Sequence, residues 1–363
     1  MSAQVTYRRL GSSGLRVSIP IVGAMSFGSK QWQPWVIEEE EALEVLKAAW
    51  DRGVNTIDTA NVYSNGVSEI IVGKFIKKYN IPRHKIIVAT KCNAIVAEQV
   101  GELTIASREK YVDNKNYVNQ FGLSRAAIFN AVEASLARLQ TPYIDLLQIH
   151  RFDPNMPVKE TMKALHDLVQ SGKVRYIGAS SMRCWQFALM NEVARKHNWT
   201  TFVSMQDEYS LLYREDEREM LAYCKFHGIG IIPWGPLNAG ALARPAQTPE
   251  TTRQNAMKAW RDVKFSDADV QIVNKVEEIA KNRGWSMAQV ALTWVNSKVA
   301  SPIVGLSSIK RLEESLIGTF ELTKEECEAL EQPCVRIYFS PCDVTAHPFI
   351  DNRYQPKLVR GHL

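Results

Sequence analysis

Short apolar runs alternate with longer amphipathic segments along most of the chain. The apolar runs are continuous, as in IDLLQI and IGIIPW, which indicates strands buried on both faces. The predicted strands span Ile19–Met25, Asn55–Asp58, Lys85–Lys91, Ile144–His150, Val174–Ala179, Phe202–Gln206, Ile229–Trp234 and Pro302–Val304. The predicted helices span Glu38–Arg52, Val67–Tyr79, Ser124–Leu139, Val158–Gly172, Cys184–His197, Asp216–His227, Asp267–Gly284 and Lys310–Thr319.

This alternation demands parallel strands that are joined by helical crossovers. Eight successive strand and helix units predict an α/β fold, a closed (β/α)8 TIM barrel. The alternative, an open doubly wound sheet, normally carries a glycine-rich dinucleotide turn after its first strand, and no GxGxxG occurs here. We predict one barrel domain over residues 1–363, a length that such barrels reach without a second domain.

Three segments depart from the alternation. Residues 5–18 contain two short β-like runs around Gly11–Gly14 and predict an N-terminal β-hairpin that plugs one end of the barrel. Residues 92–122 are long and polar, and we expect a loop that faces the substrate. Residues 332–363 are irregular and proline-rich, and we expect a C-terminal tail that wraps the barrel mouth.

Charge and cysteine usage narrow the classes of partner. The net charge of +5 is spread along the chain without a basic block, so nucleic acid is not expected, while a phosphate-bearing cofactor would satisfy it. Six cysteines without CxxC spacing indicate reduced intracellular thiols, with no disulfide and no metal. The chain has no signal-peptide core and no apolar run of about 18 residues, so we expect a cytoplasmic protein without membrane contact.

Ionisable side chains gather at the ends of neighbouring predicted strands. Asp58 ends the second strand and Tyr63 follows five residues later, whereas Lys91 ends the third strand and His150 the fourth. The carboxyl ends of parallel barrel strands meet at one rim, where such barrels hold their active sites. The sequence therefore predicts that these four side chains converge.

Their chemistry suits proton transfer. A phenol has a pKa of about 10, too high for an efficient proton donor or acceptor at neutral pH. We expect the Lys91 ammonium to lower the pKa of Tyr63 while Asp58 pairs with Lys91, and His150 to donate a hydrogen bond to a carbonyl oxygen. Alone, Asp58 is more typical of a turn or cap, and a strand-end histidine is usually a core residue. The presence of all four side chains at the ends of neighbouring strands favours a catalytic role.

These residues lie in motifs that resemble the aldo-keto reductase family over nearly the whole chain. The motifs are GVNTIDTANVYSNGVSEIIVG, VATKC, DLLQIHRFDP, GKVRYIGASS, VSMQDEYSLLYRE, IPWGPLNAG and IVGLSSIKRLEES. They are most similar to the fungal branch that includes versiconal hemiacetal acetate reductase-like and aryl-alcohol dehydrogenase-like proteins. The resemblance implies a catalytic tetrad of Asp58, Tyr63, Lys91 and His150.

The resemblance also implies NADPH or NADP+ bound in extended form across the barrel mouth. Asp58 is one of the implied cofactor residues. The residues Ser180, Ser181 and Gln206 would hold the carboxamide, and Trp234 would stack on the nicotinamide. The family's diphosphate loop reads SPLxRG, whereas this chain has GPLNAG, so Arg244 or Arg253 would supply the missing charge. Without the resemblance, Trp234 is equally compatible with core packing and Arg311 with a solvated helix start. The remaining implied cofactor residues are Gly235, Pro236, Leu237, Asn238, Ala239, Gly240, Ser307, Arg311, Glu314 and Ser315.

The function that we predict is an NADPH-dependent oxidoreductase that reduces an aldehyde or ketone, with alcohol oxidation as the reverse reaction. Its substrate would be a bulky aromatic compound or secondary metabolite, selected by the loop at 92–122, the tail, and Phe27, Trp32 and Trp35 after the first strand. The alternative is a regulatory subunit that binds cofactor with little turnover. A third possibility is a structural relic that no longer binds cofactor.

Overall fold

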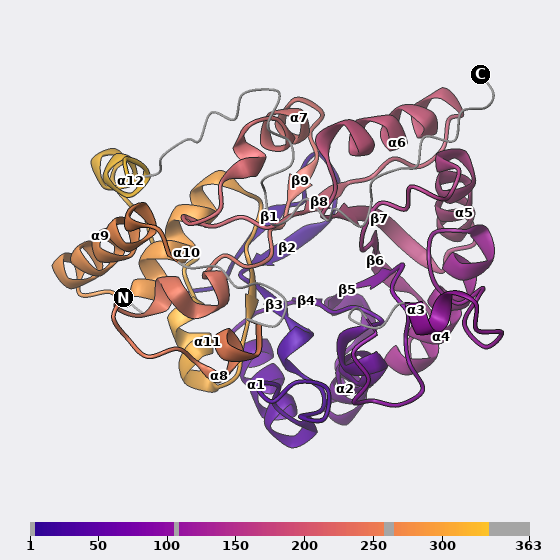
Figure 1. Ribbon diagram of the computed structural model, residues 1–363, viewed down its shortest axis with the longest axis horizontal. Coiled ribbons are helices and arrows are strands. Elements are labelled where there is room, and N and C mark those ends of the chain that lie inside the picture. The colour runs from indigo at the N-terminus through magenta and orange to yellow at the C-terminus, as the bar shows by residue number, and fades with distance from the viewer. Residues whose placement is uncertain (1–3, 105–108, 258–264, 334–363) are drawn as a thin grey trace.

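Eight parallel strands follow one another around a curled sheet in chain order. The computed structural model describes residues 4–104, 109–257 and 265–333, and Figure 1 looks onto the sheet with its surrounding helices. Within these residues the strand order is β10-β3-β4-β5-β6-β7-β8-β9, and all neighbouring pairs are parallel. The strands are β3 (Ile21–Gly23), β4 (Thr56–Asp58), β5 (Ile87–Cys92), β6 (Ile144–Ile149), β7 (Val174–Ser180), β8 (Ser204–Gln206), β9 (Gly230–Ile231) and β10 (Ile303–Gly305).

Backbone hydrogen bonds close the sheet into a barrel. Ala300 donates from its amide to Ile231 O at 2.9 Å, and Ile303 donates to Pro233 O at 2.9 Å. These bonds join the chain at β9 to the chain at β10, which itself pairs with β3 through Ile303 and Ile21. The predicted (β/α)8 barrel is therefore confirmed.

The predicted hairpin is present and lies against one end of the barrel. Its strands β1 (Thr6–Arg9) and β2 (Arg16–Ile19) pair antiparallel. Leu10 and Val17 pack with apolar side chains of the barrel strands, namely Ile21, Ile87, Ala89, Leu146, Ile232 and Ile303. Gly11 has a φ of 61°, and a Cβ there would lie 2.2 Å from Gly228 O, so only glycine fits this contact. The hairpin uses Ile19, so the first barrel strand begins at Ile21 and the predicted strand Ile19–Met25 was wrong at its start.

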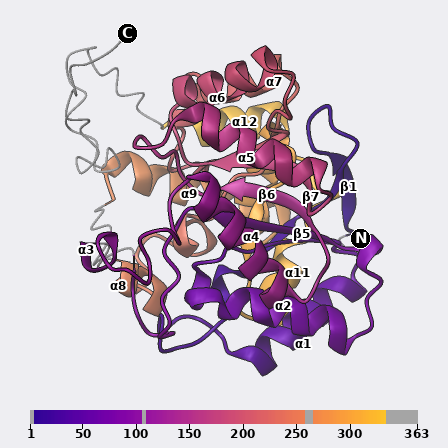
Figure 2. The same cartoon turned by 90° about the vertical axis from the view of Figure 1, so that its right-hand side faces the viewer.

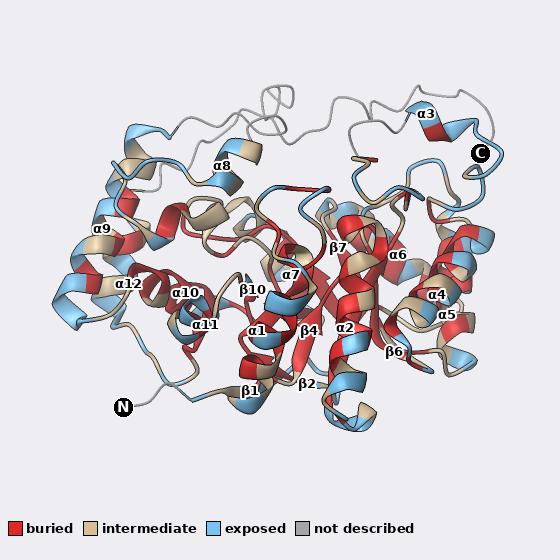
Figure 3. Ribbon diagram, turned by 90° about the horizontal axis from the view of Figure 1, so that it is seen from below, coloured by how far each residue is buried: buried red, intermediate tan, exposed pale blue. Residues whose placement is uncertain are grey.

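Helices surround the strands, as Figure 2 shows. Their buried sides face the strands and their exposed sides face outward, as the colours of Figure 3 show. Helix α5, for example, buries Met162, Leu165 and Leu168 at spacings of three residues. The helices are α1 (Glu39–Asp51), α2 (Val67–Lys78), α3 (Glu109–Val112), α4 (Arg125–Leu139), α5 (Val158–Gln170), α6 (Cys184–Lys196), α7 (Met220–Phe226), α8 (Thr252–Met257), α9 (Asp267–Arg283), α10 (Met287–Lys298), α11 (Ile309–Ser315) and α12 (Lys324–Glu331). The short 3-10 helices are η1 (Ala24–Ser26), η2 (Tyr63–Gly66), η3 (Arg83–Lys85), η4 (Glu215–Glu217) and η5 (Asn238–Ala243).

One helix was not predicted, and one predicted helix begins later than expected. Helix α10 was missed because it is buried nearly all round, from Met287 to Asn296, so it shows no amphipathic period. The helix predicted from Asp216 begins only at Met220, because the charged residues before it form η4 and its turns. Among the helices of the described residues, none combines the length and apolar character that crossing a membrane requires.

The predicted loop at 92–122 is partly ordered by contacts near the barrel mouth. It contains α3, and residues 105–108 lie outside the described part of the chain. Asn65 of η2 donates from Nδ2 to the carbonyl oxygens of Gln99, Val100 and Glu102, and its Oδ1 accepts from Ala97 N at 3.0 Å. The loop is thus tied to the segment that carries Tyr63. Of the predicted tail at 332–363, residues 334–363 lie outside the described residues.

Candidate active site

Neighbouring strands carry three of the four predicted catalytic residues to one rim of the barrel. Asp58 ends β4, Lys91 is the penultimate residue of β5, and His150 directly follows β6. The fourth residue, Tyr63, begins η2, which continues directly into α2. The parallel register of these strands therefore brings together side chains that are up to 92 positions apart in sequence, from 58 to 150.

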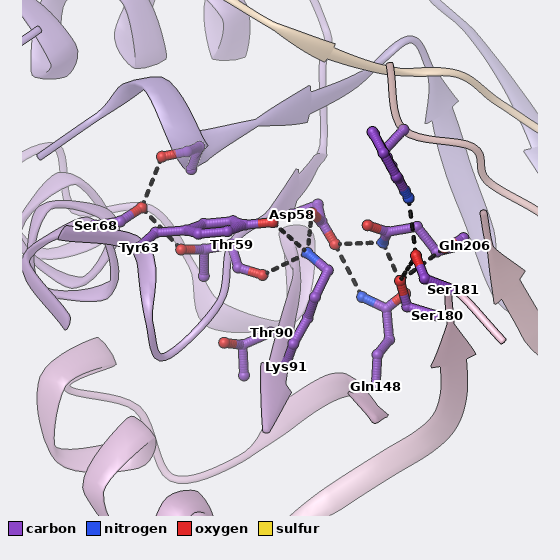
Figure 4. A network of polar contacts seen from close by, with 12 residues as sticks. Asp58, Thr59, Tyr63, Ser68, Thr90, Lys91, Gln148, Ser180, Ser181 and Gln206 are labelled. Atoms are coloured by element: carbon purple, nitrogen blue, oxygen red, sulfur yellow. Dashed lines mark hydrogen bonds and ion pairs between the residues drawn. The ribbon is translucent and has the colours of Figure 1, made fainter. Parts of the chain in front are cut away.

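The Lys91 ammonium lies at the centre of the site, as Figure 4 shows. Its Nζ donates to Asp58 Oδ2 at 2.5 Å, to the backbone oxygen of Thr59 at 2.9 Å and to the Tyr63 hydroxyl at 3.2 Å. The Lys91 and Asp58 side chains are 0% and 3% exposed, so the ion pair is shielded from water. An ammonium has three protons, and all three have an acceptor here.

His150 stands edge-on to the Tyr63 ring. The ring centroids lie 5.9 Å apart at an interplanar angle of 83°. Burial, with further contributions from the charges of Lys91 and Arg151, holds the pKa of His150 well below its usual value. The imidazole is therefore neutral at physiological pH and keeps one N–H to donate. Its Nδ1 is buried and has no hydrogen-bond partner among the described residues.

The acidity of Tyr63 differs from the prediction. Burial raises the pKa of the phenol, and although Lys91 acts in the opposite direction, the net shift is upward. The pKa of Lys91 is also raised, because its attraction to Asp58 and Tyr63 exceeds the cost of burial. The prediction that Lys91 leaves Tyr63 with a lowered pKa was wrong, since it neglected the desolvation of the phenolate.

Two glutamines complete the surroundings of Asp58. Gln148 and Gln206 each donate from Nε2 to Asp58 Oδ1 at 2.9 Å, and Gln206 Nε2 also lies 2.8 Å from Gln148 Oε1. Both residues are buried. Gln206 was predicted as a site residue, but Gln148 was missed. The available signal was a lone amide inside the apolar run IDLLQI, whose register places it opposite Lys91.

A second group of polar residues lies at the ends of β7 and β8. Ser180 donates from Oγ to Gln206 O at 2.7 Å, and its Oγ lies 3.2 Å from Ser181 Oγ. Trp234 donates from Nε1 to Ser181 Oγ at 3.0 Å. The half-buried indole of Trp234 is therefore fixed by the serine pair, which Figure 4 shows next to Gln206.

The segment after Trp234 curls into a left-handed loop. Gly235, Asn238, Ala239 and Gly240 have φ values of 70°, 45°, 52° and 93°. Pro236 and Leu237 complete the turn, which η5 continues. Successive residues in such conformations make backbone concavities that suit anions. Arg244 lies beside this loop and donates from Nε to Gly240 O at 3.2 Å.

Arg311 lies close enough to both Arg244 and Arg253 for its charge to act on them. No ion pair joins Arg253 to a carboxylate among the described residues. The guanidinium of Arg253 lies 4.6 Å from the centre of the Trp35 ring, and its Nε is buried with no hydrogen-bond partner among the described residues. Burial and the charge of Arg311 lower the pKa of both Arg244 and Arg253. An unpaired buried cation is costly, so this cluster fits an anionic ligand.

The residues predicted around the adenosine fall on or before α11. Arg311 is exposed and Glu314 is partly exposed on the same side of this helix, while Ser307 precedes it. Ser315 is only 1% exposed and donates from Oγ to Leu312 O at 2.7 Å. Its hydroxyl therefore faces the helix and not the surface that Arg311 shares with Glu314.

Two of the three predicted substrate residues contact each other. The ring centroids of Trp32 and Trp35 lie 6.3 Å apart, and the rings meet edge-on. Phe27 is completely buried in the hydrophobic core between barrel and helices. The expectation that Phe27 contacts substrate was therefore wrong, because a side chain sealed inside the core lines no binding surface.

Comparison with known proteins agrees with this geometry. The model of the family described as Aldo/keto reductase family matches residues 21–333. An aldo-keto reductase of Fusarium vanettenii is 52% identical over 99% of this chain and 94% of that protein. Versiconal hemiacetal acetate reductase of Aspergillus parasiticus is 46% identical over 91% of this chain and 97% of that protein. A putative aryl-alcohol dehydrogenase of Schizosaccharomyces pombe is 47% identical over 90% and 95%.

Proposed function

Because the chain belongs to the aldo/keto reductase family, whose members are oxidoreductases that use a nicotinamide cofactor, we propose that it reduces an aldehyde or ketone with NADPH. Oxidation of the corresponding alcohol is the reverse reaction. The observation that carries the proposal is the position of Lys91, whose Nζ contacts both Asp58 Oδ2 and the Tyr63 hydroxyl beside a neutral His150.

Each residue of this group has a distinct task. When bound, the cofactor would provide hydride chemistry next to the carbonyl group that these residues hold. The neutral His150 ring donates a hydrogen bond to the carbonyl oxygen, which stabilises the negative charge that develops there. Tyr63 then transfers its proton to that oxygen, and Lys91, held by Asp58, stabilises the phenolate that results. Gln148 and Gln206 hold the Asp58 carboxylate in place by donating to its second oxygen.

The residues at the mouth fit the dinucleotide. Trp234 offers an aromatic face, and Ser180, Ser181 and Gln206 lie next to it. Arg253 lacks an anionic partner among the described residues and lies near Trp35 and Gly305, at the end of β10, which suits it to the diphosphate. The exposed Arg311 suits the 2′-phosphate and is the basis for proposing NADPH instead of NADH.

The substrate that we propose is a bulky aromatic carbonyl compound, in keeping with secondary metabolism. Trp35 lies after β3, is partly exposed and contacts Arg253, and the buried Trp32 packs against it edge-on. Flat apolar faces bind aromatic rings well. The Aspergillus parasiticus relative is named for the reduction of versiconal hemiacetal acetate, and we propose a secondary metabolite as the substrate of the present chain as well.

The test is a steady-state assay of NADPH absorbance with a panel of aromatic aldehydes and ketones. Tyr63→Phe removes the proton donor and is expected to lower kcat by about 10²- to 10⁴-fold, while NADPH still quenches tryptophan fluorescence. Tyr79→Phe, on the outer helix α2, is the matched control and is expected to retain full activity.

Three outcomes separate the proposal from its rivals. Turnover that Tyr63→Phe abolishes supports the reductase. Tight NADPH binding without turnover on any carbonyl compound supports a regulatory subunit instead. Absence of both binding and turnover supports a structural relic.

A further inference from the structure

Ser181 holds an unusual backbone conformation at the nicotinamide end of the proposed cofactor site. Its φ is 51°, in the left-handed region that residues with a Cβ rarely adopt. Its hydroxyl accepts the hydrogen bond from Trp234 Nε1, and its amide donates to Asp207 Oδ1 at 2.5 Å. Asp207 also accepts from the backbone amide of Met182. The Asp207 carboxylate thus fixes the strained turn that positions Trp234.

The second carboxylate oxygen of Asp207 lies in acidic surroundings. Asp207 directly follows β8 and is 5% exposed, and its Oδ2 is buried without a donor among the described residues. The carboxyl of Asp216, from η4, lies within hydrogen-bonding reach of the Asp207 carboxyl. Two carboxylates can only accept, so a hydrogen bond between them requires a proton on one of the two.

The surroundings of Asp207 and Asp216 favour a proton on one of the two carboxyl groups. Burial raises the pKa of Asp207, and burial together with the charge of Asp207 raises the pKa of Asp216 well above its usual value. Arg151 favours the ionised form of Asp207, whereas Glu208 and Glu215 disfavour ionisation of Asp216. The other titratable groups that face the pair are kept neutral by raised pKa values, and these are Cys184, Tyr213 and Cys224.

We propose that Asp207 and Asp216 share one proton and together act as positioning residues for the cofactor, by holding the Ser181 turn against Trp234. With the proton present, Asp216 donates to Asp207 and the turn is fixed. When the proton is lost at alkaline pH, two adjacent carboxylates repel each other and the turn loosens. This inference rests on the proposed function, because Ser181 and Trp234 matter here as the contacts of the nicotinamide.

The test measures the dissociation constant of NADPH by tryptophan fluorescence between pH 6.5 and pH 9.5. In the wild-type protein we expect the dissociation constant to rise by about tenfold as the shared proton is lost, the equivalent of one charge-assisted hydrogen bond. Asp216→Asn supplies a permanent N–H donor to Asp207 and is expected to bind with less than a twofold change over this range. Asp51→Asn, in an exposed pair with Lys47, is the matched control and is expected to keep the wild-type pH dependence.

A second pair of variants separates positioning from general stability. Asp207→Asn retains an acceptor for the Ser181 amide and a donor for Asp216, so its NADPH affinity is expected to be independent of pH. Asp207→Ala removes the acceptor, and the dissociation constant is expected to rise about tenfold at every pH, with KM for NADPH affected more than kcat. Circular dichroism verifies that each variant is folded.

The inference is overturned if Asp216→Asn keeps the wild-type pH dependence or if wild-type affinity does not change with pH. In either case NADPH-dependent turnover at pH 7 leaves the proposed function standing. If wild-type protein neither binds NADPH nor turns over any carbonyl compound at pH 7, the proposed function fails and this inference fails with it.

Discussion

Replacing Lys91 by Met tests how strongly the buried ion pair couples the proposed catalytic residues. The Lys91 and Asp58 side chains are 0% and 3% exposed, so the substitution leaves Asp58 as an unpaired buried carboxylate. Removing one partner of a buried pair costs about 3–5 kcal/mol of unfolding free energy. Gln148 and Gln206 still donate to Asp58 at 2.9 Å, so we expect the lower end, about 3 kcal/mol.

The partner substitutions complete a double-mutant cycle. Asp58→Asn leaves the ammonium with the Thr59 oxygen and the Tyr63 hydroxyl, and the ammonium can shed its proton, so we expect a loss of about 2 kcal/mol. The double variant Lys91→Met/Asp58→Asn removes both charges together. We expect it to lose only about 2 kcal/mol, about 3 kcal/mol less than the sum of the single losses.

Urea unfolding at pH 7 measures all three variants, with the free energy taken from the midpoint and the slope of the transition. Lys47→Met, which breaks an exposed pair with Asp51, is the control and is expected to cost less than about 1 kcal/mol. If the double variant loses as much unfolding free energy as the two single variants together, the two charges do not stabilise each other. The account of Lys91 as an ammonium held by Asp58 would then be refuted.

Three further changes test other parts of the structure. Gly73→Ala places a Cβ 2.7 Å from the backbone of Leu139, so urea unfolding is expected to show a loss of about 1–3 kcal/mol; an unchanged stability would contradict this close contact between α2 and α4. Arg253→Met removes the cation assigned to the diphosphate and is expected to raise KM for NADPH about tenfold or more in initial-rate kinetics, with a smaller change in kcat. Because folding lowers the pKa of His150, the folded state takes up fewer protons, and wild-type stability is expected to fall as pH drops below about 6.5. His150→Gln should remove this part of the pH dependence in unfolding experiments at pH 5 to 7.

The sequence was enough to predict that Asp58, Lys91 and His150 converge, because the strand topology determines most of this arrangement. Asp58, Lys91 and His150 each stand at the end of a strand, and β4, β5 and β6 are neighbours in the sheet as they are in the chain. Knowing the strand ends is therefore enough to bring these three side chains together. Tyr63 lies in η2, after the strand end, and its spacing of five residues from Asp58 placed it at the same rim.

The sequence did not predict features that depend on how deeply a side chain is buried or on irregular backbone. The apolar character of Phe27 is equally compatible with a pocket wall and with the core, and only packing decides between them. The contact between Asp207 and Asp216 crosses a loop of short turns, where no periodicity gives a spacing. The pKa of Tyr63 depends on a balance between desolvation and the Lys91 charge, and composition does not reveal which is larger.

That balance bears on the direction of the proposed reaction. A phenol whose pKa is raised by burial stays protonated at neutral pH, so Tyr63 holds the proton that a nascent alkoxide must receive. Alcohol oxidation needs the phenolate as a base, and this form becomes abundant only at strongly alkaline pH. Lys91 still has a role in reduction, because its ammonium lies 3.2 Å from the oxygen that becomes negative after the proton has left. For the proposed reaction, we therefore expect carbonyl reduction to be faster at neutral pH and alcohol oxidation to be faster at alkaline pH.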